Sequence, residues 1–427
     1  MKTLKELKYF LILWITQSFS ALGSAMTNFA LVIWLYGESG SALTTALLSV
    51  CSYAPYVLMS IFAGALSDRW DKRKTMLWCD SFAAVCTVIV MALMLSGKLE
   101  VWHLYILNAV NGLMNTVQQP ASDVATTLLA PPEHYQKISG MRSFSNSLVT
   151  ILTPVLATSV MSFFGIFAVF AVDMVTFLAA FLSLLLFIKI PDIAGESDKK
   201  ESVLSAAKSG LKYLKTNLGI LWLILFLAAI NLIASMYDAM LPALIIPREN
   251  GGESALGWVN TFVGIATLAG SIIVTFMPEP KSRVRVICNT LLFSMSTENF
   301  LLAFGRTPVV WCIGAVLGWI PIPLMNGCMD VIFRTKIPAE MQGRVYSARN
   351  TFQFFTIPIG FFLGGFLVDE VFEPLMSGLS ADSLPVLLFG SGKGAGAAAL
   401  SFVLGIAGAA VCLIFRCNKH IWELEKK

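Results

Sequence analysis

Charged residues are scarce in this sequence. Asp, Glu, Lys and Arg make up only 13% of the 427 residues, whereas hydrophobic residues make up 56%. An average soluble domain contains about 25% charged residues. A water-soluble core could not enclose so much apolar surface, so the composition excludes a soluble globular protein and predicts an all-α polytopic membrane protein. The net charge of +4 is also too small to indicate nucleic-acid binding.

Clustered cysteines and histidines are missing as well. None of the eight cysteines forms a CxxC pair or a zinc-binding spacing, and most lie in or beside apolar runs. This pattern excludes a disulfide framework and indicates buried free thiols. The three histidines lie at the ends of apolar runs or in a tail. We therefore expect no metal, no cofactor and no enzymatic activity, and no loop is long enough to form the soluble domain of a sensor.

Long apolar runs are abundant. A helix needs about 20 apolar residues to cross the hydrocarbon core of a bilayer, and twelve stretches meet this length. They are roughly residues 9–36, 41–66, 75–96, 101–123, 137–163, 165–190, 217–247, 255–277, 284–304, 308–333, 344–368 and 394–416. The first run is too long for the apolar region of a signal peptide, which spans about 7–15 residues. We expect it to be an uncleaved first span.

The positive charges predict the orientation of these twelve spans. With the N-terminus inside, 26 of the 30 Lys and Arg residues lie on the inner side. Only Lys98, Arg248, Arg306 and Lys393 fall outside. Such an asymmetry follows the positive-inside rule. It predicts a multi-pass protein of the cell membrane with both termini in the cytoplasm.

A charged linker and an internal repeat divide the chain in two. Residues 191–216 are rich in Asp, Glu and Lys and follow the sixth span. Five matches at a constant offset of 207 residues relate the loops after spans four and ten: Asp123 with Asp330, Pro131 with Pro338, Glu133 with Glu340, Lys137 with Arg344, and Arg142 with Arg349. We expect two pseudo-symmetric six-helix halves, 1–190 and 217–427, joined by a cytoplasmic linker at 191–216.

Polar residues within the spans follow helical periodicity. On spans one, four, seven and ten they recur every three or four residues, which gives one polar stripe on each helix. Polar side chains in a membrane need water or each other, so we expect these four helices to line a central cavity. Aromatic residues add an apolar wall that suits a bulky hydrophobic ligand. The candidate cavity residues are Gln17, Asn28, Asn108, Asn111, Asn115, Asn231, Tyr237, Trp319, Asn326, Phe352, Gln353 and Phe355. Hydrogen bonding between packed helices is the alternative for the polar residues, and lipid contact is the alternative for the aromatic ones.

Three acidic residues lie within the spans and are candidates for proton coupling. They are Asp173, Asp238 and Glu298. A carboxyl group in a medium of low dielectric constant is more easily buried with its proton than without it. Asp238 belongs to a predicted cavity helix. Asp173 and Glu298 lie on spans six and nine, which we expect at the periphery, and an interhelical hydrogen bond is the alternative role for both.

A short charged loop separates spans two and three. The stretch Gly64-Ala65-Leu66-Ser67-Asp68-Arg69-Trp70-Asp71-Lys72-Arg73-Lys74 resembles the hairpin signature of the major facilitator superfamily. Asp80, Pro120-Ala121 with Leu128-Leu129-Ala130-Pro131, Asp173, Lys336-Ile337-Pro338 and Gly343-Arg344-Val345-Tyr346-Ser347 resemble its bacterial macrolide-efflux branch. The resemblance covers nearly the whole chain. It implies the superfamily fold, alternating access, and proton-driven export of hydrophobic compounds, macrolide-like drugs among them.

The sequence departs from the drug–proton antiporters of that superfamily in places. Asn108 stands four residues before Gly112, where those proteins often have Arg, and the glycines expected around Pro154 are absent. No acid lies inside span one. The resemblance therefore implies no particular residue for proton coupling.

The charged loop predicts an inner gate. We expect Asp68 to face the N-terminus of span eleven near Arg344, where the helix dipole favours an anion. We also expect Asp123 to pair with Arg69 or Arg73, and Gly64 to allow the close approach that the gate requires. The alternative for the basic residues is that they only anchor the topology.

The predicted partners are the lipid bilayer, a hydrophobic small molecule and protons, and we expect a monomer. Two other functions stay open from the sequence. The first is proton-coupled uptake of a small metabolite. The second is a membrane enzyme or sensor that transports nothing.

Overall fold

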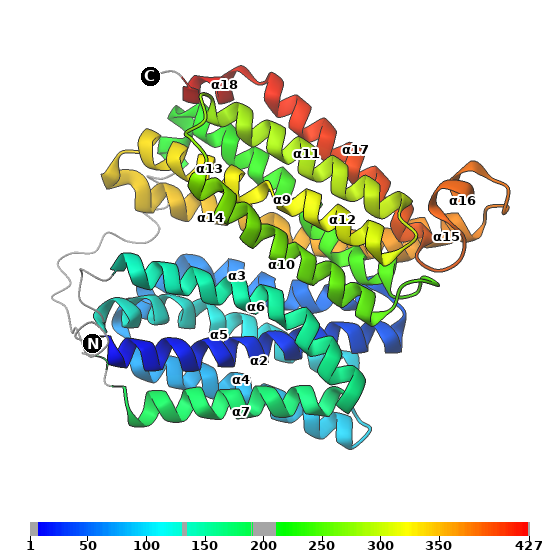
Figure 1. Ribbon diagram of the computed structural model, residues 1–427. Coiled ribbons are helices and arrows are strands. Elements are labelled where there is room, and N and C mark those ends of the chain that lie inside the picture. The colour runs from blue at the N-terminus through cyan, green and yellow to red at the C-terminus, as the bar shows by residue number, and fades with distance from the viewer. Residues whose placement is uncertain (1–6, 130–134, 189, 191–210, 426–427) are drawn as a thin grey trace. The chain divides into compact units, whose positions relative to one another are not determined.

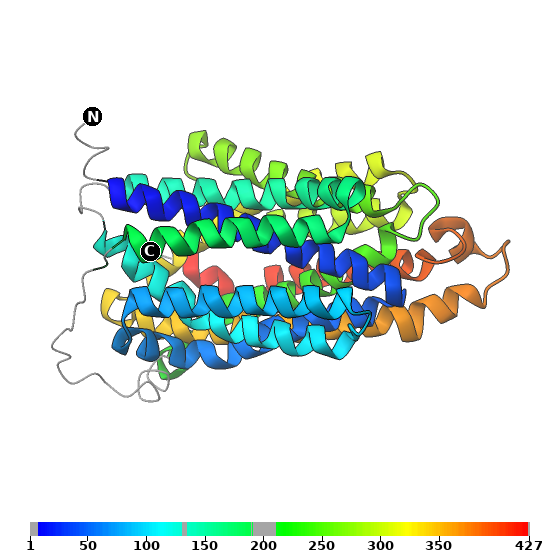
Figure 2. The ribbon, with the colours of Figure 1, turned by 90° about the horizontal axis from the view of Figure 1, so that it is seen from below.

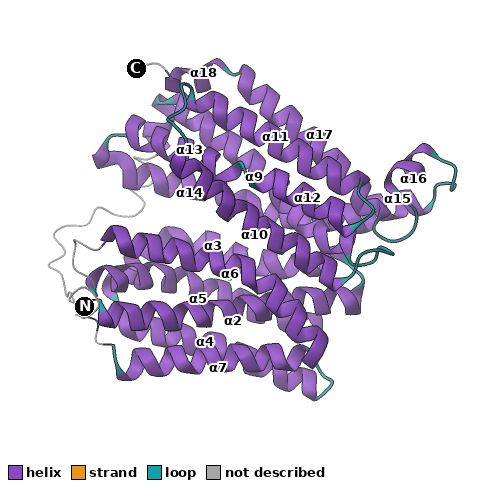
Figure 3. Ribbon diagram, in the orientation of Figure 1, coloured by secondary structure: helices purple, strands orange, loops and turns teal. Residues whose placement is uncertain are grey.

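The computed structural model consists of helices joined by short turns (Figures 1 and 3). It describes residues 7–129, 135–188, 190 and 211–425, and within the helices it leaves out the side chains at 60–69, 123, 127, 135–137, 139, 339–344 and 346–348. No β-strand occurs in these described ranges. The long helices are α2 (Lys8–Ser39), α3 (Ala42–Arg69), α4 (Lys72–Leu95), α5 (Val101–Leu128), α6 (Tyr135–Phe164), α7 (Ile166–Leu186), α9 (Leu218–Ile245), α10 (Glu253–Phe276), α11 (Arg283–Phe304), α12 (Pro308–Trp319), α13 (Ile322–Lys336), α14 (Ala339–Phe366) and α17 (Ala395–Cys417). Shorter elements are η2 (Leu367–Phe372), α15 (Glu373–Ser377), α16 (Leu384–Phe389), α18 (Lys419–Trp422) and η3 (Glu423–Glu425).

The predicted fold class, an all-α polytopic membrane protein, is confirmed. Eleven segments of the described chain are long and apolar enough to cross a membrane. The remaining predicted span corresponds to α5, a helix of 28 residues. Its polar stripe of Asn and Gln residues makes it less apolar than the other spans. Most helix bounds lie within a few residues of the predicted spans, because a helix needs a minimum apolar length to cross the membrane.

Predicted span ten is broken in the structure. The first part, α12, ends at Trp319, and α13 begins at Ile322. Pro321 and Pro323 flank this beginning, and proline cannot donate the backbone hydrogen bonds that would continue the first helix. The break places Trp319 at a free helix end. Pro308–Lys336 still forms one candidate membrane span, so the predicted span is confirmed, but its helix is interrupted at Ile320 and Pro321.

Predicted span eleven continues further than expected. After α14 the chain forms the π-helical turn η2 and then α15, so the helical path ends at Ser377. The predicted span ended at residue 368, just before the acidic residues Asp369, Glu370 and Glu373. Single π-helical turns inside α-helices are frequent at functional sites.

The chain forms two compact units. The first contains Met1–Trp34 and Cys51–Lys200, and the second contains Leu35–Val50 and Glu201–Lys427. The end of α2 and the beginning of α3 thus belong to the second unit. The predicted division into 1–190 and 217–427 stays a prediction. Of the predicted linker, the structure describes only residues 211–216, which are helical, and Tyr213 donates a hydrogen bond to the carbonyl oxygen of Lys336 at 3.2 Å.

In the first unit, α4 packs against α5 and α7, and these helices run side by side in both ribbon views (Figures 1 and 2). A buried cluster from α2, α4, α5 and α7 joins them. It contains Leu13, Met76, Ala121, Ala125 and Leu184. Removing such apolar side chains from polar surroundings is the general driving force for burial, and close packing adds dispersion contacts inside the bundle.

In the second unit, α9 packs against α14, and α11 packs against α17. Two glycines one helical turn apart make the first of these contacts close. A Cβ atom on Gly360 would lie 2.5 Å from the carbonyl oxygen of Leu232, and one on Gly364 would lie 2.7 Å from the Cα of Met236. Small residues four positions apart let membrane helices approach in this way.

We predict that Gly360→Ala lowers the free energy of unfolding by about 1–3 kcal/mol, since overpacking a tight contact forces the helices apart. The matched control is Gly327→Ala on α13, where an added Cβ meets no atom within 4 Å. Thermal unfolding in detergent measures both. Equal melting temperatures for the two variants would contradict the prediction.

Candidate functional site

Several helices expose only apolar side chains in mid-span. Phe82, Val85 and Ile89 of α4 are exposed, and so are Val175 and Leu178 of α7. Apolar side chains can face lipid at no cost. These faces therefore have the character of a lipid-facing surface.

Helix α6 exposes Asn146 and Thr150, and four further helices also expose polar side chains within their spans. They are Asn28 of α2, Asn115 of α5, Asp238 of α9 and Asn326 of α13. An exposed amide or carboxylate at this depth needs water or a polar ligand beside it. These helices are the four for which the sequence predicted polar stripes. The other stripe residues are more enclosed.

In the first unit, the buried acid Asp80 accepts a hydrogen bond from Gln17, one of the predicted cavity residues. Gln17 of α2 donates to Asp80 of α4 at 3.1 Å, and Gln118 of α5 donates to the other oxygen of the same carboxylate. Asp80 is 8% exposed. The three side chains tie three helices together. Sequence reasoning singled out Asp80 only through the resemblance and did not find its two partners.

Two further stripe residues of α5 are half-buried. The Asn108 side chain donates to the Leu104 carbonyl oxygen of its own helix at 3.0 Å. The side-chain oxygen of Asn111 is buried and has no hydrogen-bond partner within the described part of the chain. An unpartnered buried oxygen costs free energy unless water or a ligand reaches it.

Asp173 of α7 is surrounded by hydroxyl groups. Ser24 and Thr27 of α2 donate to its two oxygens at 3.0 Å each, and Thr87 of α4 donates at 3.3 Å. Its side chain is only 3% exposed. Gly23 brings α2 close, because a Cβ there would lie 2.9 Å from the Cα of Asp173. The carboxylate therefore joins α2, α4 and α7 by hydrogen bonds.

Glu298 and Asp238 form the second acidic group, within the second unit. Glu298 of α11 is 3% exposed, and Trp319 donates its indole N–H to Glu298 at 2.9 Å. Gly318 makes room for this contact, because a Cβ there would overlap the Glu298 side chain. The Tyr237 hydroxyl is buried near the Glu298 carboxylate. Asp238 is close enough for its charge to influence the Glu298 carboxylate electrostatically. The end of α12 at Trp319 thus lies against the buried carboxylate of Glu298.

The remaining cavity candidates of the second unit lie on α9 and α14. Asn231 donates to the backbone carbonyl oxygen of Gln353 at 3.1 Å. The Gln353 side chain accepts from Arg349 at 3.1 Å. The Asn231 hydrogen bond therefore joins α9 to α14, and the Gln353 side chain fixes Arg349 on its own helix. Phe352 and Phe355 are exposed.

The exposed phenylalanines extend along α14 as one apolar face. They share spacings of three and four residues with further exposed side chains, so they lie on one side of the helix. The members of this face are Phe352, Phe355, Ile359, Phe362 and Phe366.

Most of the predicted gate lies outside the described side chains. Gly64, Asp68 and Arg69 are within α3, Asp123 is within α5, and Arg344 is within α14, but only their helical backbone is described. The gate contacts therefore stay predictions. Arg73 is described. Its guanidinium donates to the carbonyl oxygens of Leu184 at 3.1 Å and of Leu185, at the end of α7, where the helix dipole favours a cation.

A cluster of metal ligands is another possible kind of site. Nowhere in the described residues do three or more His, Cys, Asp or Glu side chains gather as a metal ion would require.

These features define a class of protein: a multi-pass, all-helical membrane protein with exposed polar groups and acids inside its spans. The family model described as Major Facilitator Superfamily matches residues 13–361. The chain belongs to this family. It is a membrane transporter and not an enzyme.

Two bacterial efflux proteins are similar to the chain. Macrolide efflux protein A of Streptococcus pyogenes is 23% identical over 370 residues, which are 86% of this chain and 90% of the relative. The multidrug efflux pump Tap of Mycolicibacterium fortuitum is 23% identical over 385 residues, with the same shares of 86% and 90%.

Solved structures show the same fold at lower identity. The nucleoside transporter NupG has a TM-score of 0.71 and 11% identity, and the match covers 95% of this chain and 98% of that one. A bacterial homologue of the iron transporter ferroportin, in an inward-facing state, has a TM-score of 0.64 and 15% identity, with 96% and 99% covered.

We predict that Asp173→Leu lowers the free energy of unfolding by about 2 kcal/mol, because hydrogen bonds between membrane helices contribute about 0.6 kcal/mol each and three hydroxyls would lose their acceptor. The control is Ser81→Ala, since the Ser81 hydroxyl donates to the Leu77 carbonyl oxygen of its own helix. Chemical unfolding in mixed micelles measures both. A loss no larger than that of Ser81→Ala would show that the Asp173 hydrogen bonds do not stabilise the unit.

Proposed function

We propose that this transporter exports hydrophobic or amphipathic compounds, macrolide-like drugs among them, by proton-coupled antiport. The observation that carries the proposal is Asp238. It is an exposed carboxylate within the membrane-spanning helix α9, seven residues before the helix ends at Ile245, and it lies in the same unit as the buried acid Glu298. Such a pair can bind and release a proton during a transport cycle. The efflux functions named for the two relatives support the direction of transport.

The side chains of the second unit support a hydrophobic substrate. The apolar face of α14 offers aromatic surface, and Asp238 and Asn326 are exposed polar groups of the same unit. Sites for drug-sized ligands combine apolar walls with a small number of polar groups. A phosphate or an organic acid would instead call for Lys or Arg inside the spans.

The acid pair gives a simple coupling scheme. When the site faces outside, Asp238 takes up one proton, and the neutral acid no longer attracts the polar or cationic end of the substrate, which leaves. When the site faces inside, the proton leaves and the carboxylate is ready for the next substrate. Glu298, which accepts a hydrogen bond from Trp319, is the second acid of the scheme.

Alternating access would come from rocking of the two halves, 1–190 and 217–427, about this site. The charged loop would act on the inner side, with Asp68 facing the N-terminus of α14 near Arg344 and Asp123 facing Arg69 or Arg73. The halves and the gate follow from the sequence pattern. We also propose the membrane orientation that the distribution of Lys and Arg predicts, with both termini in the cytoplasm. We further propose that the transporter is a monomer.

Proton-coupled uptake of a small metabolite is the second candidate. The exposed amides Asn28 and Asn115 of the first unit favour it, because they would suit a polar substrate. Antiport and symport differ in the direction in which a proton gradient drives the substrate.

The experiment uses purified protein in liposomes with an imposed pH gradient and a panel of labelled hydrophobic drugs that includes a macrolide. We expect drug movement against the direction of proton flow and its loss when a protonophore is added. Asp238→Asn should lower gradient-driven transport about tenfold or more, because an amide cannot carry the proton. Ser81→Ala is the control with transport unchanged.

The outcomes separate the candidates. Movement of a panel member together with the protons would replace export by symport. No gradient-dependent movement of any panel member would refute the export proposal. Full proton dependence in Asp238→Asn would remove this residue from the coupling scheme.

A further inference from the structure

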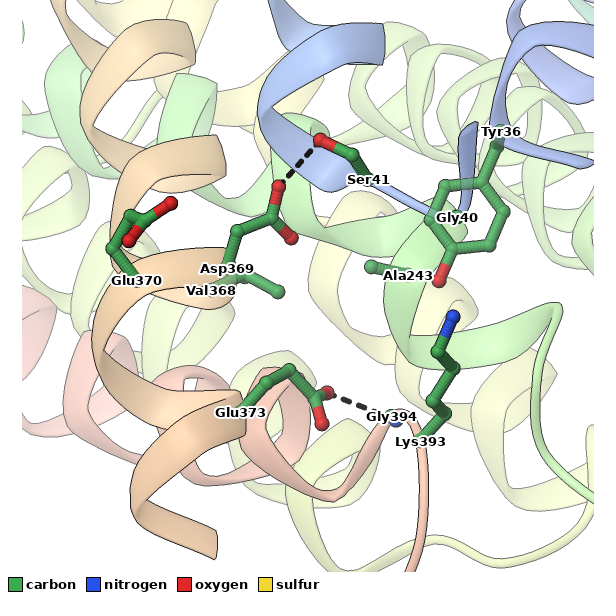
Figure 4. Close-up of a pocket in the computed structure, with 10 residues that line it drawn as sticks. All are labelled: Tyr36, Gly40, Ser41, Ala243, Val368, Asp369, Glu370, Glu373, Lys393 and Gly394. Atoms are coloured by element: carbon green, nitrogen blue, oxygen red, sulfur yellow. Dashed lines mark hydrogen bonds between the residues drawn. The ribbon is translucent and has the colours of Figure 1, made fainter. Parts of the chain in front are cut away.

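A carboxylate from the end of span eleven caps the beginning of α3. Asp369, in the π-helical turn η2, accepts hydrogen bonds from the Ser41 hydroxyl at 2.6 Å, from the Ala42 backbone N–H at 3.0 Å and from the Leu43 backbone N–H at 2.8 Å. Figure 4 shows the Asp369 side chain pointing to the start of α3. All of these residues belong to the second unit.

The contact uses two properties of a helix beginning. The first backbone N–H groups of a helix have no partner within the helix, and the helix dipole places partial positive charge there. Asp369 satisfies two of these groups with one negative charge. Because the partner lies 326 residues away in the sequence, the cap holds two distant helices together.

Tight backbone packing accompanies the cap. Gly365, one turn before Asp369, lies against α3, where an added Cβ would be 2.6 Å from the Cα of Leu43 and 3.0 Å from the Cβ of Ala46. A side chain at 365 would therefore push α3 away. The polar cap and the steric fit act on the same few residues.

A second carboxylate on the same helical path provides an internal comparison. Glu373 accepts from the backbone N–H groups of Gly394 at 2.9 Å and Ala397 at 3.3 Å. These amides begin α17. Asp369 and Glu373 are one turn apart and cap two different helices, and both line a cavity of about 320 Å³ with Lys393 and Tyr36 (Figure 4).

The two caps differ in what they join. Glu373 and α17 both lie in the predicted half 217–427. Asp369 instead joins this half to α3, whose sequence lies in the predicted half 1–190. If the halves rock during transport, the first contact persists and the second has to break.

We propose that the Asp369 cap on α3 is the latch of the outer gate, closed while the transporter faces inside and broken when it faces outside. This inference rests on the proposed alternating access and on the predicted orientation, which places the α2–α3 turn outside. The latch is made by a carboxylate, two backbone amides and one hydroxyl. It needs no pairing of charged side chains.

The latch is the counterpart of the predicted inner gate. Asp68 lies at the end of α3 and is predicted to face the beginning of α14. Asp369 follows the end of α14 and caps the beginning of α3. The same two helices would thus hold each other at both ends, and alternating access requires that the two contacts form in turn.

The test measures the distance between the end of α2, next to the start of α3, and α15, which follows Asp369 in the chain. Spin labels at Glu38→Cys, at the end of α2, and Leu375→Cys, in α15, occupy exposed positions. The accessible native cysteines are replaced by serine, and distances are measured by double electron–electron resonance in lipid nanodiscs without substrate. We expect Asp369→Asn to raise the ratio of long to short distances about tenfold, since hydrogen bonds to a charged group are worth about that factor or more.

Each latch variant has a matched control that tests for general destabilisation: Glu373→Gln for Asp369→Asn, and Gly364→Ala for Gly365→Ala. Glu373→Gln alters the same kind of cap on α17, and Gly364→Ala adds a methyl group against α9 one residue away from Gly365. Neither should change the distance ratio. Gly365→Ala should raise the ratio as Asp369→Asn does, by steric exclusion and without any change of charge. Ser41→Ala, which removes one of three hydrogen bonds, should give a smaller rise.

An unchanged distribution in both Asp369→Asn and Gly365→Ala would overturn the latch. Equal shifts in Glu373→Gln and Gly364→Ala would also overturn it, because the effect would then be general loosening. The result does not depend on transported drug. A chain that moves no compound of the panel can still show the latch, and an active exporter can still lack it.

Discussion

A carboxylate inside a membrane protein has to be compensated, and this requirement organises much of the structure. Hydrocarbon offers no hydrogen bonds, so an enclosed acid needs donors from neighbouring helices or a proton. In the first unit Asp80 has two amide donors and Asp173 has three hydroxyl donors. In the second unit, the hydrogen bond found for Glu298 comes from Trp319, and Asp238 is exposed. The acids of the first unit therefore have more hydrogen-bond donors than the acids of the second unit.

This difference suggests a division of roles. The acids of the first unit hold α2 against its neighbours, and changing them should mainly affect stability. The acids of the second unit are the proposed proton carriers, because their compensation is incomplete. The same physics recurs at Asp369 and Glu373, where backbone amides of helix beginnings supply the donors. A membrane helix beginning is a strong and reversible anchor for a carboxylate, since its N–H groups need a partner in every state.

The helical fold could be predicted well from the sequence, because apolar length and charge asymmetry are properties of single segments. The breaks were harder. Hydropathy does not change at Pro321, so the interruption between α12 and α13 was missed although two prolines signalled it. Asp369 and Glu373 did not fit an apolar span, and their hydrogen-bond partners could not be predicted. These partners, the first amides of α3 and α17, lie in distant parts of the sequence. Periodicity likewise identified the face of Gln17 but not its partner Asp80. A polar stripe identifies one face of a single helix. A hydrogen bond between helices also depends on how the two helices pack.

The central claim is that Asp238 and Glu298 carry the proton that drives export. The most direct test is to add substrate to purified transporter in weakly buffered detergent solution and to measure the protons released. The account predicts release of about one proton per bound substrate near neutral pH, as expected when a ligand binds the deprotonated form of a shared acid pair. It predicts no release from Asp238→Asn, with substrate binding retained. Release from Asp238→Asn equal to that of the unmodified protein would contradict it.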